Sequence, residues 1–136
     1  MAVTYRARVL SPVSSDEVRL IDDAVVVIDD DGRLQTVAPW AGGGCDADLR
    51  PHLLVPGFVD AHVHFPQTRA VGSASGPLLT WLNESIFPEE ARFADASHAQ
   101  QVAVEFCQAL ASSGTTFALV YGSVHASASE ILLNTM

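Results

Sequence analysis

From Leu53 onward the chain follows the order strand, long loop, helix, strand and the start of a second helix. The second of these strands is the clearest signal. The segment Thr115 to Tyr121 (TTFALVY) is a short run of apolar, β-branched and aromatic residues that is closed by Gly122. Such a run is typical of a parallel strand that is buried on both faces. Strand, helix and strand in this order predict an α/β protein that opens with a parallel sheet.

The helix between the two strands carries signals at both of its ends. Ser97 and Gln100 are spaced as a capping box, and Gly114 is expected to stop the helix. One face of this helix should cover the sheet. The apolar residues that define this face are Val102, Phe106 and Leu110.

The second helix is expected to start at another capping box, formed by Ser127 and Glu130. No helix stop precedes Met136, so we expect this helix to be cut off after roughly two turns. A lone strand-helix-strand unit leaves two strand edges unpaired. We therefore expect the 136 residues to be an incomplete folding unit.

The first part of the chain is expected to be all-β. Residues 3–10 alternate loosely, and residues 24–28 and 33–37 flank the turn sequence Asp30-Asp31-Gly32, which predicts a hairpin. The glycine-rich segment Trp40 to Pro51 is interpreted as a connection. The expected domains are residues 1–54, part of a β-sandwich, and residues 55–136, the start of a β/α barrel.

Composition excludes several classes of protein. The chain carries sixteen acidic residues against seven basic ones, a net charge of -9, which argues against nucleic acid as a partner. No stretch is apolar enough for a signal peptide or a membrane span, so a cytoplasmic protein without a membrane partner is expected. Cys45 and Cys107 are expected to be free thiols.

The sharpest motif is the segment Val55 to His64 (VPGFVDAHVH). Side chains alternate along a strand, so Phe58, Asp60, His62 and His64 are expected to share one face. Two histidines at the carboxyl end of a barrel strand can bind one metal ion. The alternative is a chance pair of partly buried histidines. The Pro-Gly start, the preceding acid and the loop that follows favour metal binding, with Asp60 orienting a histidine.

That loop, Phe65 to Phe93, contains Gln67 and a short helix expected over residues 77–82 with proline in its first turn. We expect the loop to cap the metal, although an ordinary surface excursion is the alternative. His52, His98 and His125 are interpreted as a linker residue, a first-turn helix residue and a loop residue.

The stretch from Pro56 to Phe93 resembles the guanine deaminases of the amidohydrolase superfamily. It contains the H-x-H pair, a glutamine three residues later, the segment Pro77-Leu78-Leu79-Thr80-Trp81-Leu82 and an F-P-x-E turn. Matching elements follow at residues 113–116 and 131–133. The likeness covers most of residues 55–136, with a weaker, generic amidohydrolase likeness before them.

The resemblance implies a (β/α)₈ barrel flanked by a β-sandwich assembled from both ends of a longer chain. It implies that His62 and His64 bind Zn²⁺, that Gln67 hydrogen-bonds the purine, and that His64, Phe65 and Pro66 form one wall of the pocket. It also implies a homodimer for the full-length enzyme.

The implied reaction is the hydrolytic deamination of guanine to xanthine and ammonia by a zinc-activated water. The remaining ligands and the proton-shuttling glutamate are expected beyond Met136, so the chain alone should be inactive. The family pattern predicts an aromatic residue after the glutamine. Thr68 and Arg69 stand there instead and depart from this pattern.

Two other interpretations stay open. Another amidohydrolase, acting on a purine, pterin or triazine, would keep the histidines, but Gln67 and Trp81 argue against it. A catalytically inactive fragment would fit the missing ligands. The cytidine-deaminase type of site is excluded because its H-x-E and P-C-x-x-C motifs are absent from the sequence.

Overall fold

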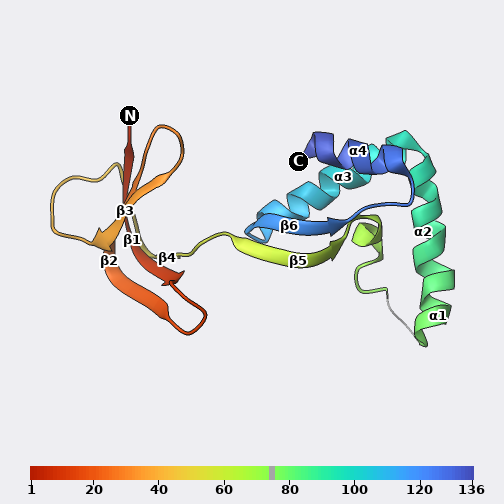
Figure 1. The fold of residues 1–136 in the computed structure, drawn as a ribbon, viewed down its shortest axis with the longest axis horizontal. Coiled ribbons are helices and arrows are strands. Elements are labelled where there is room, and N and C mark those ends of the chain that lie inside the picture. Colours follow the sequence, from red (N-terminus) through yellow and green to blue (C-terminus); the bar gives the residue numbers. More distant parts are fainter. Residues whose placement is uncertain (74–75) are drawn as a thin grey trace. The chain divides into compact units, whose positions relative to one another are not determined.

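A computed structural model describes residues 1–73 and 76–136 of the chain, which divides into two compact units (Figure 1). The units are Met1–Pro56 and Gly57–Met136. The first is all-β and the second is built of strands and helices, so the predicted α/β class is confirmed. Ala74 and Ser75, which belong to the stretch that resembles guanine deaminases, lie outside the described residues.

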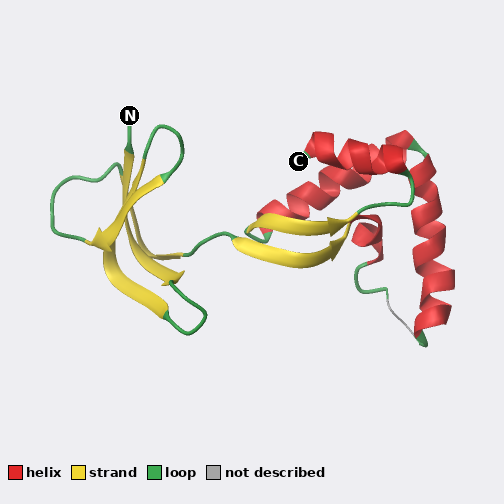
Figure 2. Cartoon of the chain, viewed as in Figure 1, coloured by secondary structure: helices red, strands yellow, loops and turns green. Residues whose placement is uncertain are grey.

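The first unit is a single four-stranded sheet in the order β3-β2-β1-β4 (Figure 2). The strands β1, β2 and β3 pair antiparallel, which confirms the predicted hairpin, and β4 lies parallel to β1. The strands are β1 (Val3–Pro12), β2 (Val18–Ile28), β3 (Leu34–Pro39) and β4 (Ala47–Leu54).

Strand β4 corrects one prediction. Residues 40–51 are interpreted from the sequence as a connection, and His52 as part of a linker, but Ala47 to His52 lies within β4. The polar composition of this segment looks like a loop. Its pairing with β1, with Tyr5 opposite Ala47 and Arg6 opposite Asp48, provides hydrogen bonds that a local pattern does not reveal.

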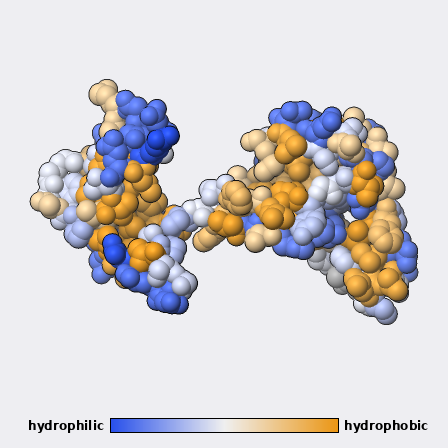
Figure 3. All heavy atoms as spheres, viewed as in Figure 1, coloured by the Kyte–Doolittle hydropathy of each residue, from blue (hydrophilic) through white to orange (hydrophobic). Residues whose placement is uncertain are grey.

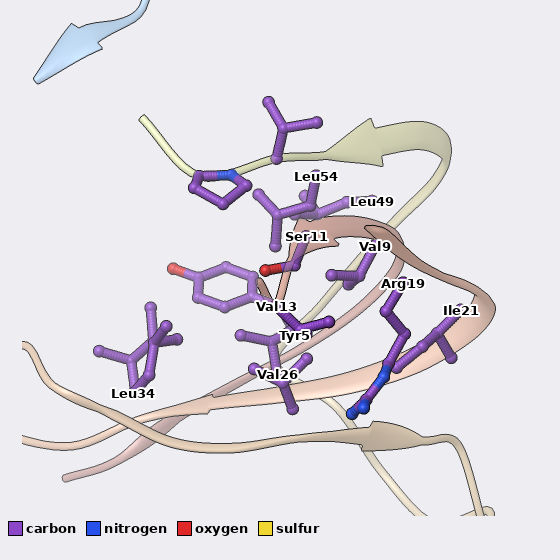
Figure 4. Close-up of a pocket in the computed structure, with 14 residues that line it drawn as sticks. Tyr5, Val9, Ser11, Val13, Arg19, Ile21, Val26, Leu34, Leu49 and Leu54 are labelled. Carbon is purple, nitrogen blue, oxygen red and sulfur yellow. The ribbon is translucent and has the colours of Figure 1, made fainter. Parts of the chain in front are cut away.

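The two faces of this sheet differ. One face carries a cluster of charged residues. Arg6 pairs with Asp23 at 2.6 Å and lies over the Trp40 ring, and Arg50 pairs with Asp48. The buried residues are Ala7, Val9, Ala24 and Val26. An apolar groove of about 500 Å³ lies on the unit (Figure 4), lined by residues that include Tyr5, Ile21, Ile28, Leu34, Leu49 and Leu54.

The second unit pairs two parallel strands and packs helices against one face of the pair. Strand β5 (Phe58–His64) lies beside β6 (Thr115–Tyr121), and α3 (Ala96–Ser112) connects toward β6. The helix α4 (Ala126–Thr135) follows β6. Between β5 and α3 come η1 (Phe65–Ala70), α1 (Leu78–Trp81), η2 (Leu82–Ile86), α2 (Phe87–Ala91) and η3 (Arg92–Ala94).

The expected long loop is therefore largely helical. The short helix expected over residues 77–82 is present as α1, with Pro77 as its cap residue, and it continues through η2 into α2. The F-P-x-E segment lies in α2 rather than in a turn. Among the described residues, no helix is long and apolar enough to cross a bilayer.

The predicted helix starts were wrong in detail. The side chain of Asp95, not Ser97, caps α3: its Oδ1 accepts a hydrogen bond from the Ser97 backbone N–H at 2.7 Å. At α4 the cap residue is His125, whose side chain makes no capping bond, so the Ser127 and Glu130 box is also wrong. Gly114 ends α3 as predicted, with φ at +76°.

The core of the second unit lies between the helices and one face of the strand pair. Phe65, Phe93 and Phe106 pack edge to face, with ring centroids 5.0 and 5.7 Å from that of Phe65. Val102, Ala103, Ala128 and Leu132 complete this core, and Val63 and Val120 pack against it from the strands.

The other face of the strand pair is open. Phe117 and Leu119 are 66% and 52% exposed, so β6 is not buried on both faces as its sequence predicts. Helices cover only one side of β5 and β6 in the described structure. Figure 3 shows apolar residues over these strands.

Candidate metal centre at the end of strand β5

The two histidines of the H-x-H motif converge. The Nε2 atoms of His62 and His64 lie 3.0 Å apart, and their ring centroids are separated by 5.0 Å. His62 is exposed and His64 is half-buried. Their predicted position on one side of the strand is therefore what the structure shows.

This geometry can be tested against a metal ion. Zinc binds histidine nitrogen at about 2.0–2.1 Å, so two nitrogens 3.0 Å apart can both reach one ion at an angle of about 95°. A tetrahedral angle needs them only a few tenths of an ångström further apart. The pair fits two positions of a metal centre.

The structure modifies the expected role of Asp60. Its Oδ1 accepts a hydrogen bond from the backbone N–H of His62 at 3.0 Å, and so holds the strand rather than an imidazole. The register between β5 and β6 shifts between Asp60 and Val63, as in a bulge. The strict alternation of side chains expected over residues 58–64 is therefore interrupted.

Tyr121 is a neighbour that sequence reasoning missed. It is the register partner of His64 at the end of β6, and its ring stacks on His64 with centroids 4.8 Å apart and planes 12° apart. The same ring lies 4.5 Å from His62. The signal was available, because the ends of neighbouring parallel strands meet at one edge of a sheet.

The residues expected to contact substrate lie in and beside η1. Phe65 is fully buried in the core and Pro66 is buried, whereas Gln67 is half-buried. The Phe65 ring is thus occupied by packing against Phe93 and Phe106. The Phe65 side chain therefore belongs to the core.

Thr68 and Arg69, which depart from the family pattern, have structural partners. The Thr68 hydroxyl donates to the Phe65 carbonyl at 2.7 Å. Arg69 donates through Nε and Nη2 to the two carboxylate oxygens of Glu105 on α3, at 2.9 and 2.5 Å. These hydrogen bonds from Arg69 hold the pKa of Glu105 below its ordinary value and raise that of Arg69. The bonds from Arg69 fasten η1 to α3, whereas the bond from Thr68 stays within η1.

Several other titratable side chains of this unit have partners or surroundings of their own. His98 is buried and meets Glu89 at 3.0 Å, and Glu89 also pairs with Arg92. Burial raises the pKa of the Cys107 thiol. Within residues 1–73 and 76–136, no three His, Cys, Asp or Glu side chains gather as a metal cluster.

The fold and the imidazole pair together indicate the class of protein to which this chain belongs. Residues 53–136, which contain the parallel strands and the imidazole pair, match the model of the amidohydrolase family, and the chain belongs to that family. Members generally use a divalent metal ion.

Several of the individual proteins to which the chain is similar are guanine deaminases. The chain is 53% identical over 83 residues to a probable guanine deaminase of Deinococcus radiodurans, covering 61% of this chain and 19% of that protein. It is also similar to two solved structures of guanine deaminases. That of E. coli is 31% identical with a TM-score of 0.85, over 99% of this chain and 34% of the other.

The second structure, the guanine deaminase of C. acetobutylicum, has guanine bound in its active site. It is 26% identical with a TM-score of 0.88, over 98% of this chain and 33% of the other. The chain thus spans between a fifth and a third of the length of the relatives described here.

Proposed function

We propose that this chain contributes part of the active site of a zinc-dependent guanine deaminase, which hydrolyses guanine to xanthine and ammonia. The observation that carries the proposal is the convergence of the His62 and His64 Nε2 atoms at 3.0 Å, directly before the helix that holds Gln67. The similarity to three guanine deaminases supports the choice of substrate.

His62 and His64 are the residues of this chain that would hold the metal. When bound, zinc lowers the pKa of a coordinated water from about 15.7 toward 7 and makes hydroxide available near neutral pH. Both imidazoles must be neutral to bind, so each keeps its proton on Nδ1 and offers Nε2.

The proposed roles of the remaining residues concern binding. The half-buried amide of Gln67 both donates and accepts hydrogen bonds, as the edge of a purine requires. His64, Pro66 and the backbone of Phe65 would form the wall beside it. The ion pair of Arg69 with Glu105 keeps η1, and with it Gln67, in place on α3.

Further ligands and the groups that move protons to the ring and to the leaving amine are proposed to come from other residues of the enzyme. We also propose a cytoplasmic homodimer for the full-length enzyme. The elution volume of the purified protein on a calibrated sizing column, combined with light scattering, tests the dimer.

The test of the function uses the polypeptide that the complete gene encodes. It should release ammonia from guanine, and His62→Ala or His64→Ala should lower kcat/KM by more than about a thousandfold, because each removes a ligand of the metal. His52→Ala, an exposed histidine of β4, is the matched control and should retain activity.

Two outcomes would contradict the proposal in different ways. Full activity of His64→Ala would refute the metal assignment. Release of ammonia from a pterin or triazine, but not from guanine, would refute the substrate and leave the metal site standing.

A further inference from the structure

The position of Tyr121 follows from the parallel pairing of β5 and β6. The last residues of the two strands, His64 and Tyr121, are register partners, so their side chains leave the sheet side by side. The phenol ring is nearly parallel to the His64 imidazole, with planes 12° apart, and tilted by 41° against His62. One aromatic ring therefore contacts both imidazoles.

The backbone that carries Tyr121 is closely held. A Cβ atom on Gly122 would lie 2.6 Å from the Ser129 hydroxyl of α4, so a larger residue here would require the serine side chain to rotate. Two residues further on, the Val124 backbone N–H donates to Glu90 of α2 at 3.1 Å. The Ser129 hydroxyl donates to the Ser123 carbonyl at 3.4 Å, so the segment after Tyr121 is hydrogen-bonded to both α2 and α4.

The two imidazoles also contact each other, Nε2 to Nε2 at 3.0 Å, but a hydrogen bond there needs a proton on one Nε2 and is lost when both nitrogens bind a metal ion. The carboxylate of Asp60 is bonded to the backbone N–H of His62, so it leaves the ring free. An imidazole on an exposed strand end can occupy several rotamers, and only some of these bring both Nε2 atoms together.

We propose that Tyr121 is a positioning residue for the metal site: its ring holds the His62 and His64 imidazoles with their Nε2 atoms converging. This inference rests on the proposed function, in which the pair binds the metal. Imidazoles that bind a cation become electron-poor, and the electron-rich face of the phenol favours that state. The stacking therefore strengthens when the metal is bound.

The test measures metal binding rather than activity alone. In the polypeptide that the complete gene encodes, stripped of metal, Co²⁺ affinity is measured by competition with a chelator, and its visible absorption reports ligand geometry. Tyr121→Leu should weaken Co²⁺ binding by about tenfold, the range found when a group that orients a metal ligand is removed. Tyr121→Phe keeps the ring and should bind as the wild type does.

The control is Phe117→Leu, which removes an exposed aromatic ring from the same strand and should leave Co²⁺ affinity unchanged. If Tyr121→Leu fails to fold, Tyr121→Met tests the same loss of the ring with an unbranched side chain.

Equal Co²⁺ affinity in the wild type and in a folded, ring-free variant would overturn the role of Tyr121 while the metal site stands. An equal loss in Tyr121→Phe would also overturn it, because the hydroxyl would then be the group required. Absence of Co²⁺ binding in the wild type would instead refute the proposed function together with this inference.

Discussion

At the scale of single residues, the candidate site depends on a few side chains with divided tasks. His62 and His64 offer nitrogen atoms, and Asp60 and Tyr121 hold the backbone and the rings around them. The adjoining segment η1 carries Gln67 and is tied to α3 through Arg69. Binding and anchoring are thus assigned to different side chains, and substitutions can separate them.

Gln67 is expected to act on substrate binding. In the complete enzyme, Gln67→Ala should raise the KM for guanine by about tenfold and change kcat less, because one hydrogen bond to the purine is lost. Steady-state kinetics with guanine measure this. Gln101→Ala, at an exposed position on α3, is the control and should leave KM unchanged. A loss confined to kcat would contradict the binding role.

The ion pair of Arg69 and Glu105 predicts a dependence of stability on pH. The pKa of Glu105 is lowered in the folded state by its hydrogen bonds from Arg69, so the unfolded state binds the proton more tightly. The stabilisation is present above the ordinary carboxyl pKa and is lost as pH falls through the lowered one.

The melting temperature of the wild type should therefore exceed that of Glu105→Gln by a small margin near pH 6, and the margin should shrink toward pH 3. Asp95→Asn, which keeps a capping group, provides a comparison away from this ion pair. A margin that grows on acidification would show that the sign of the effect is opposite.

At the scale of elements, helix α3 owes its start to Asp95. Its carboxylate accepts the Ser97 N–H at 2.7 Å, and Ser97 contributes only its backbone to this bond. Asp95→Ala should lower the free energy of unfolding by about 1 kcal/mol, whereas Ser97→Ala should cost less than about 0.5 kcal/mol. Denaturant titrations of both variants measure this. A larger cost at Ser97 would restore the capping box predicted from the sequence.

Periodic apolar residues made most of the fold predictable. Val102 and Phe106 mark the buried face of α3, because burial on one side imposes a regular spacing on a helix. The apolar, β-branched run Thr115 to Tyr121 marks β6, although only one face of this strand is buried. The pairing of His62 and His64 was predictable because side chains alternate along a strand, so two residues with one residue between them lie on the same side. The glycine signal at Gly114 was equally local.

Features that depend on distant partners were missed. Strand β4 looked like a connection because its partner, β1, lies some forty residues earlier in the chain. Apart from the short helix expected over residues 77–82, the helices between Phe65 and Ala96 looked like a loop, since each is too short to show a helical spacing of apolar residues. Tyr121 was missed because its contact with His64 arises from pairing across the sheet.

At the scale of the whole molecule, each unit leaves an apolar face open. In the second unit, Phe117 and Leu119 of β6 and Phe58 of β5 are more than half exposed. In the first unit, the groove of about 500 Å³ has a mostly apolar lining. Contiguous apolar surface of this kind favours association with other apolar surface.

The polypeptide of these 136 residues, produced by itself, should therefore bind the hydrophobic dye ANS and associate in solution. The resemblance to amidohydrolases implies a β-sandwich, in which a second sheet would cover the groove of the first unit. Leu34→Ser combined with Val37→Thr replaces two exposed apolar side chains of the groove, and should lower both dye fluorescence and association.

The matched control for that pair is Leu20→Ser. Leu20 is 51% exposed on β2 and adjoins Ile21, but its side chain is outside the groove lining, so its replacement should have little effect on either measurement. Dye fluorescence and light scattering give the two readouts. An equal effect of Leu20→Ser would show that general hydrophobicity, not the groove, drives association. A monomeric polypeptide that binds no dye would contradict the expectation that these 136 residues bind ANS and associate.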